Sequence, residues 1–175
     1  GGGAAVGQNF AISTAPGDDC ITPAAGGNAD GVAAVAWCLD ASTFITDPFP
    51  MPVIRTDVYV RLYDESGAAI TDPILVNDTL RRASAPSVAV DASGRVAVVW
   101  LDSRGGTFAS HVYCQYYGSD GTPDGSNFRI DTSDTTCLSA RCAAADDGAL
   151  RVVWQQAQTE HVLSRPLNAD GTFQG

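Results

Sequence analysis

Few residues of this chain have the chemistry of a catalytic centre. The sequence of 175 residues holds two histidines, His111 and His161, and both fill one position of a repeated pattern in which the first copy has Asp57. Catalysis needs a residue once, whereas a residue that recurs with a repeat usually serves the structure of that repeat. We therefore predict no catalytic residue and no enzyme.

The acidic residues are the next candidates, because clustered carboxylates can bind metal ions. Six of them precede glycines in short polar segments, Asp30, Asp91, Asp120, Asp146, Asp147 and Asp170. An aspartate in a turn hydrogen-bonds its own backbone, so these need no ligand. Calcium takes six to eight converging oxygens, and Asp18 and Asp19 are its best candidates. We expect no other cofactor.

Five cysteines without a C-x-x-C pair suggest disulfides, and hence an exported protein. Cys20 lies just before a predicted strand, and Cys38 ends the strand that should pair with it. We predict a Cys20–Cys38 bridge. Cys137 has Cys142 as its nearest candidate partner, and Cys114 is left as a buried thiol or an inter-chain link.

The elements that carry these residues are three copies of one repeat. "GVAAVAW", "GRVAVVW" and "GALRVVW" end at Trp37, Trp100 and Trp154, each six residues after a glycine. Alternating short apolar runs and glycine turns predict strands, and no helical period competes with them. We predict one all-β repeat domain, residues 1–175, of antiparallel four-stranded blades like those of a β-propeller. The blades span 20–78, 83–132 and 137–175.

The second copy carries a family resemblance. Its segments "PSVAVDASGRVAVVWLDSRGG" and "HVYCQYYGSDGTPDGSNFRID" resemble the propeller-type repeats of large exported bacterial proteins. The resemblance implies a propeller-like fold and an extracellular or cell-surface location. No copy contains the S-x-D-x-G-x-x-W box of sialidase propellers, which disfavours a glycosidase.

The first strand of the sequence looks like the last strand of a blade. "GQNFAIST", residues 7–14, matches "GSNFRIDT", residues 125–132, and the third copy has no such segment after its third strand. Three blades are too few to close a ring. We therefore predict that residues 7–14 complete the third blade of another copy, in a two-chain ring or an open filament. A piece of a longer propeller and a closed monomer are the alternatives.

The segment from Asp40 to Asp57 is the longest connection within a repeat. Long loops on rigid scaffolds often bind partners, and exposed apolar side chains mark contact surfaces. We expect a partner contact there, and the alternative is a loop folded over its own blade. The candidate binding residues are Phe44, Phe49, Met51 and Ile54.

The charge of the chain limits its partners. Its net charge is −10, with ten arginines and no lysine, so it should repel nucleic acid and anionic lipid. The longest apolar run, Val32 to Leu39, is too short to cross a membrane.

The function predicted from the sequence is that of a non-catalytic extracellular structural protein, a subunit of a cell-surface oligomer or filament formed by strand exchange. Its partners would be copies of itself through the N-terminal strand, with surface glycans or another surface protein as further candidates. A lectin-like carbohydrate-binding propeller is the alternative, and a glycosidase-type propeller ranks last.

Overall fold

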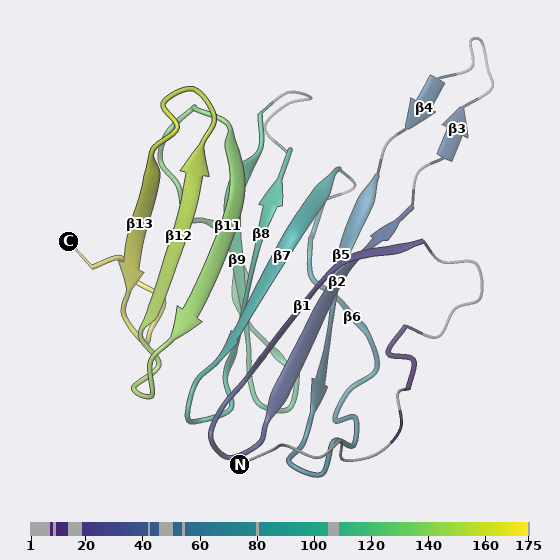
Figure 1. Cartoon of the computed structure of the whole chain (residues 1–175), viewed down its shortest axis with the longest axis vertical. Coiled ribbons are helices and arrows are strands. Elements are labelled where there is room, and N and C mark those ends of the chain that lie inside the picture. Colours follow the sequence, from purple (N-terminus) through teal and green to yellow (C-terminus); the bar gives the residue numbers. More distant parts are fainter. Residues whose placement is uncertain are drawn as a thin grey trace.

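The computed structural model shows a protein built from antiparallel strands (Figure 1). It describes residues 8, 10–13, 19–41, 43–45, 51–53, 55–79, 81–104 and 109–174. Within these ranges there is no helix, and so none that is long and apolar enough to span a membrane. The all-β prediction is confirmed.

Three sheets follow one another along the chain, and we call them blades 1, 2 and 3. Blade 1 has the order β1 (Cys20–Gly27), β2 (Ala33–Asp40), β5 (Thr56–Tyr63) and β6 (Ile74–Leu75). Blade 2 contains β7 (Ala83–Val90), β8 (Val96–Asp102), β9 (His111–Tyr117) and β10 (Pro123–Arg129). Blade 3 has three strands among the described residues, β11 (Cys137–Ala144), β12 (Leu150–Gln156) and β13 (Val162–Leu167). A separate hairpin, β3 (Thr43–Ile45) and β4 (Met51–Val53), projects from blade 1 (Figure 1).

The turns between strands follow from glycine and aspartate. Gly94 adopts a φ of +82°, a left-handed conformation that favours glycine, and its N–H donates to the carbonyl of Asp91 at 3.0 Å. The Asp91 carboxylate accepts bonds from the N–H groups of Ser93 and Arg95 at 2.8 and 3.0 Å. This confirms, for Asp91, that the turn aspartates bond their own backbone.

The core lies between the blades. Every residue of β8 is buried, because blade 2 has a neighbour on each face. On one face Val98 and Trp100 pack with Cys38 and Val60 of blade 1. On the other face Val99 and other apolar side chains meet blade 3, where the contacts are Val152, Trp154 and Leu167.

The tryptophans of blades 2 and 3 each face the preceding blade, and Trp37 lies on the corresponding face of blade 1. Trp100 is fully buried between blades 1 and 2, and Trp154 lies between blades 2 and 3. Trp37 lines the outer face of blade 1, which has no neighbouring blade among the described residues, and its ring stacks on Tyr59 with centroids 6.0 Å apart. We call this the free face of blade 1.

Residues 10–13 lie against blade 1. They form no strand, and the carbonyl of Ile12 accepts a bond from Arg61 Nη1 at 3.2 Å. Completion of blade 3 by this segment of another chain is not shown, so it stays a prediction.

Replacing Trp100 with alanine should destabilise the protein by about 3–5 kcal/mol, because the cavity would open between two blades and cannot collapse. Urea denaturation of the two proteins measures the difference. The control is Leu138→Ala, at a side chain that is 52% exposed, which should cost about 0.5 kcal/mol or less. Equal losses for the two variants would contradict a core located between the blades.

Candidate functional site

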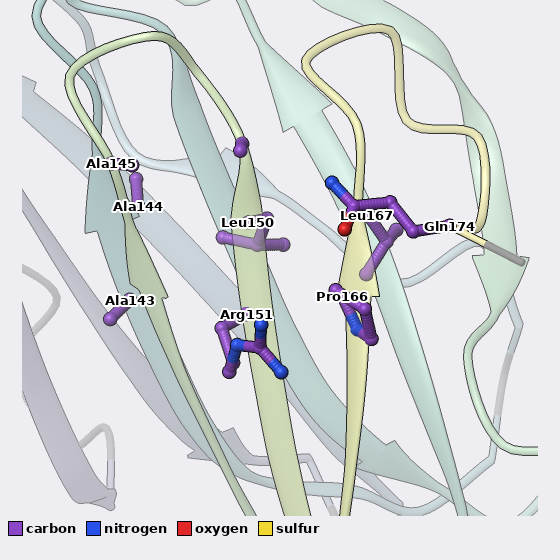
Figure 2. Close-up of a pocket in the computed structure, with 9 residues that line it drawn as sticks. Ala143, Ala144, Ala145, Leu150, Arg151, Pro166, Leu167 and Gln174 are labelled. Carbon is purple, nitrogen blue, oxygen red and sulfur yellow. The ribbon is translucent and has the colours of Figure 1, made fainter.

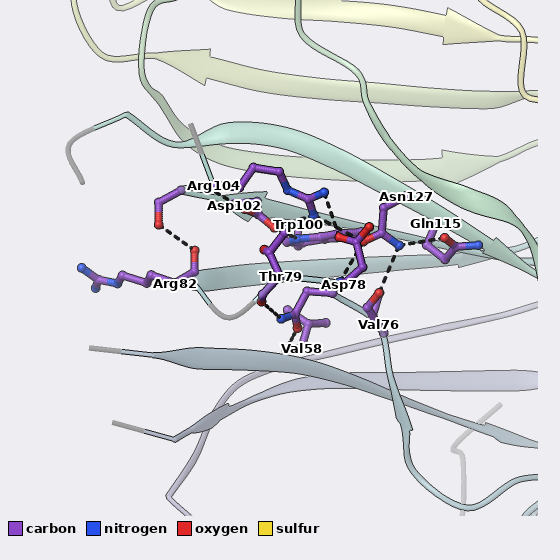
Figure 3. A network of polar contacts seen from close by, with 12 residues as sticks. Val58, Val76, Asp78, Thr79, Arg82, Trp100, Asp102, Arg104, Gln115 and Asn127 are labelled. Atoms are coloured by element: carbon purple, nitrogen blue, oxygen red, sulfur yellow. Dashed lines mark hydrogen bonds and ion pairs between the residues drawn. The ribbon is translucent and has the colours of Figure 1, made fainter. Parts of the chain in front are cut away.

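Polar side chains gather at the end of the blades where β8 stops and β9 starts (Figure 3). They come from blades 1 and 2. We call them the polar cluster, which consists of Asp78, Trp100, Asp102, Arg104 and Asn127.

Asp102 is the centre of this cluster. Its side chain is fully buried, and its carboxylate accepts bonds from Trp100 Nε1 at 3.1 Å and from the Arg104 N–H at 2.8 Å. Side chains two residues apart in a strand share a face, so the tryptophan and the aspartate meet. A buried carboxylate needs a cation, and Arg104 Nη2 supplies it at 2.8 Å.

Arg104 links this buried carboxylate to an exposed one. Its Nη1 lies 2.8 Å from the carboxylate of Asp78, whose side chain is 54% exposed. The guanidinium stacks on the ring of Tyr113 at 3.9 Å. Burial acts to lower the pKa of Arg104, but the hydrogen bond and charge of Asp102 raise it above its ordinary value.

Asn127 ties the two blades together beside this ion pair. Its Nδ2 donates to the carbonyl of Val76 at 3.1 Å and to Gln115 Oε1 at 2.8 Å. Its Oδ1 accepts the N–H of Asp78 at 3.1 Å. The backbone and the carboxylate of Asp78 are therefore both held, and the cluster presents an oriented carboxylate to solvent at the junction of two blades.

We predicted a structural role for the position that the histidines share. In blades 1 and 2 this position belongs to a group of hydrogen bonds that joins two strands, and we call this group the clasp. In blade 2, Asp131 accepts the N–H of Val112 at 2.7 Å and lies 2.9 Å from His111 Nδ1. In blade 1, Asn77 accepts the N–H of Val58 at 2.7 Å and donates to Asp57 at 3.0 Å.

Because both described clasps join the end of a fourth strand to the start of the third, His111 serves the repeat. Arg129 Nη2 also lies 2.8 Å from Asp131, so this buried carboxylate is paired. His161, at the equivalent position of blade 3, is exposed.

The structure does not contain the predicted Cys20–Cys38 bridge, and all five cysteines are free thiols in it. Cys38 faces blade 2, with its Sγ 3.8 Å from the carbonyl of Ala83. Cys20 lines the opposite, free face of blade 1 beside Trp37. Sequence position along a hairpin does not reveal that the two side chains point to opposite faces.

The other predicted bridge fails for a different reason. Cys137 and Cys142 lie on one strand, β11, where five residues span roughly 16 Å. A disulfide requires Cα atoms within about 7 Å of each other. Cys114, left over in the sequence, is completely buried between blades 2 and 3.

The remaining sequence candidates are not brought to the polar cluster by any described contact. Phe44 and Met51 lie in the β3–β4 hairpin, whereas Phe49 and Ile54 lie outside the described residues. Of the calcium candidates, Asp18 is also outside them, and Asp19 is exposed. No group of three metal-binding side chains occurs in the described part of the chain. The binding role of the hairpin stays a prediction.

Two shallow hollows lie on the outer blades. One, of about 280 Å³, is on blade 3 and is lined by Ala143, Leu150, Arg151, Pro166 and others (Figure 2). The second, of about 260 Å³, is on the free face of blade 1 and is lined by Phe10, Ile12, Trp37 and others. Carboxylates line neither hollow, so the polar cluster is the better candidate for chemistry.

Sequence reasoning did not single out Asp78, Asp102, Arg104 or Asn127. The signal it could have used is the phrase "WLDSR", in which an aspartate follows a repeated tryptophan by two residues. The first and third copies have Leu39 and Gln156 at this place, so Asp102 belongs to blade 2 alone.

Comparison with known proteins supports the fold. No family model and no curated protein matches the chain. Among solved structures it is similar to the endo-arabinase from Bacteroides thetaiotaomicron, at 17% sequence identity and a TM-score of 0.58. The match covers 95% of this chain and 62% of that one, so this chain spans less than two thirds of the enzyme's length. The chain is thus an all-β, propeller-like protein.

This finding corrects the function predicted from the sequence. The hypothesis of a non-catalytic structural protein is contradicted, because the structure that the chain resembles belongs to a carbohydrate-active enzyme. The repeats identified the architecture, but architecture alone does not determine activity.

The buried ion pair can be tested by removing one partner. Arg104→Gln should lower the free energy of unfolding by about 3 kcal/mol, because Asp102 would stay buried without its cation. Asp78→Asn, at the exposed end of the same pair, should cost about 1 kcal/mol or less. Urea denaturation at pH 7 measures both, and a small loss for Arg104→Gln would contradict the assigned role of the arginine.

The free thiols predict a selective alkylation pattern. Burial raises the pKa of Cys137 and of Cys142 to about 11, and it raises the pKa of Cys38 and Cys114 as well. Thiolates react and thiols do not, so iodoacetamide at pH 8 should modify Cys20 first and the other four after unfolding. Peptide mass spectrometry reads the order. A protected Cys20 linked to Cys38 would restore the disulfide prediction.

Proposed function

We propose that the chain is a propeller-like, glycosidase-type protein that acts on arabinose-containing polysaccharide. The single observation that supports this most is the likeness of almost the whole chain to an endo-arabinase. This proposed enzymatic function replaces the non-catalytic function that we predicted from the sequence. An extracellular location remains part of the proposal, because such a substrate is too large to enter a cell.

The polar cluster is the place at which we propose that the sugar chain meets the protein. Glycoside hydrolysis uses two carboxyl groups, and at least one must reach the glycosidic bond. Asp102 is fully buried and therefore acts through Arg104, whereas Asp78 is exposed. We assign Asp78 as the carboxylate that contacts the sugar.

The surroundings of Asp78 suit that role. Arg104 and Asn127 fix its carboxylate and its backbone, so the group does not have to be ordered when the substrate binds. Two of the other carboxylates at this end, Asp57 and Asp131, are buried and paired with Arg55 and Arg129. Within the described residues, these clasps supply no second exposed carboxylate, and we assign the second carboxyl group of the reaction to no residue.

The test is release of reducing sugar from arabinan, with xylan and cellulose as comparison substrates. Asp78→Asn should lower the rate by on the order of 100-fold or more, because the amide cannot take up a proton or attack the sugar. Its melting temperature should stay close to that of the parent protein, since the side chain is exposed.

The matched control is Asp120→Asn, at an exposed turn on the opposite end of blade 2. This aspartate bonds only its own turn in the described contacts, through Thr122, so its replacement should leave the rate unchanged. Absence of hydrolysis on all three polysaccharides would overturn the proposed activity. Binding of arabinan without hydrolysis would overturn it as well.

A further inference from the structure

The described residues near the N-terminus have the contacts of a strand that belongs to a neighbouring blade. "GQNFAIST" matches "GSNFRIDT", so Phe10 corresponds to Phe128 and Ile12 to Ile130. Phe128 lies in β10, the fourth strand of blade 2. This correspondence allows the surroundings of the two segments to be compared contact by contact.

The first shared contact is an arginine on a carbonyl. In blade 3, Arg165 on β13 donates to the carbonyl of Ile130 in blade 2. In blade 1, Arg61 is the repeat equivalent of Arg165, and its Nη1 donates to the carbonyl of Ile12 at 3.2 Å. Equivalent arginines therefore donate to equivalent carbonyls at the two positions.

The second shared contact is aromatic. The ring of Phe128 lies 6.4 Å from that of Phe173 in blade 3, at an interplanar angle of 60°. The ring of Phe10 lies 6.2 Å from that of Tyr63 in blade 1, at 56°. In each case the arginine also lies over the second ring, at 4.6 Å for Arg165 and 5.8 Å for Arg61.

Between blades 1 and 2 the same junction is made through an amide. Gln115 stands where blades 1 and 3 have an arginine. Asn127 Nδ2 donates both to Gln115 Oε1 and to the carbonyl of Val76, which corresponds to Ile12. At all three places a side chain of the following blade donates to the fourth-strand carbonyl, from the third strand through Arg61 and Arg165 and from the fourth strand through Asn127. Residues 10–13 occupy the place of a fourth strand, beside blade 1, without a third strand of their own.

Blade 3 presents the complementary surface. Among the described residues it has no fourth strand, and Val162 at the start of β13 is 74% exposed, whereas its equivalents Val58 and Val112 are completely buried. Arg141 and Arg151 lie on this face, and each donates within its own blade, Arg141 Nη1 to the carbonyl of Ala140 at 2.7 Å and Arg151 Nη1 to Ser164 at 3.4 Å.

We propose that the free face of blade 1 binds blade 3 of a second copy of this chain, with residues 10–13 in the fourth strand of that blade. The contact would repeat the two blade junctions that each chain already contains. It would cover Val162 and Trp37 and pair the open edge of β13. Two copies joined in this way on both sides form a closed ring of two-fold symmetry, which is compatible with an enzyme.

Light scattering of the purified chain after size exclusion tests the contact. The expected mass is twice the 18.1 kDa of one chain. Val162→Asp should raise the dissociation constant at least about 10-fold, because it buries a charge in the contact. It should leave the circular dichroism unchanged, since the side chain is exposed in one chain. The control Ile70→Asp, in the loop between β5 and β6, should leave the dimer intact.

A single-chain mass at every concentration would overturn the proposal. So would a dimer that Val162→Asp does not weaken. Neither result depends on whether the protein cleaves arabinan, so this proposal and the proposed function can fail separately.

A cross-link tests the register. In blade 2, Phe128 pairs with Cys114, whose equivalent in blade 3 is Ser164, so Phe10 should lie opposite Ser164 of the second copy. Phe10→Cys and Ser164→Cys, each made in a Cys20→Ser background and then mixed, should form a disulfide-linked dimer on a non-reducing gel. Thr172→Cys, at an exposed turn, replaces Ser164→Cys as the control and should not link.

Two results of this experiment would count against the proposal. Absence of a link between the mixed chains would exclude the register. In a variant that carries both Phe10→Cys and Ser164→Cys, a disulfide within one chain would show that the N-terminal segment completes blade 3 of its own chain.

Discussion

Apolar packing between adjacent blades is the interaction on which the rest of the structure depends. A four-stranded sheet of this size has two faces, and blade 2 buries both, so β8 has no residue that water can reach freely. Full burial of a valine or leucine side chain contributes about 1.5–3 kcal/mol, and β8 alone contributes three valines and a leucine. The outer blades each bury one face in this way.

The polar groups at the blade ends are arranged so that this packing does not leave buried charges alone. Asp102 and Asp131 are almost completely buried, and each is paired with an arginine that reaches toward solvent. Each also accepts a backbone N–H, from Arg104 and Val112. An isolated carboxylate at either position would cost several kcal/mol of stability. The two arginines therefore stabilise the fold, whatever further role they have in an activity.

The repeat was predictable because it depends on local patterns. Glycine turns, alternating apolar runs and the tryptophan spacing all appear in the sequence, and the strands begin at Cys20, Ala83 and Cys137 as those patterns indicate. The direction of side chains was not predictable. β1 and β7 each contain a bulge, with Thr22 and Ala85 at a φ of +51°, and a bulge disturbs the alternation of faces on which a cysteine pairing relies. The polar cluster was missed because Asp78 and Asn127 are each more than twenty residues from the Trp100–Arg104 segment and meet it only when the strands and blades pack.

A site in a repeated fold can arise where one repeat departs from the others. A feature shared by blades 1 and 2, such as the clasp of Asn77 and Asp131, is maintained by the packing of strands and serves the scaffold. The polar cluster differs, because Asp102 and Arg104 have no equivalents in the other copies and Asp78 comes from the neighbouring blade. Departure from the repeat at a junction of two blades creates an asymmetric surface on a symmetric scaffold. In the proposed function, a sugar chain would be oriented by this asymmetric surface, so that the irregular residues rather than the repeated ones would determine its specificity.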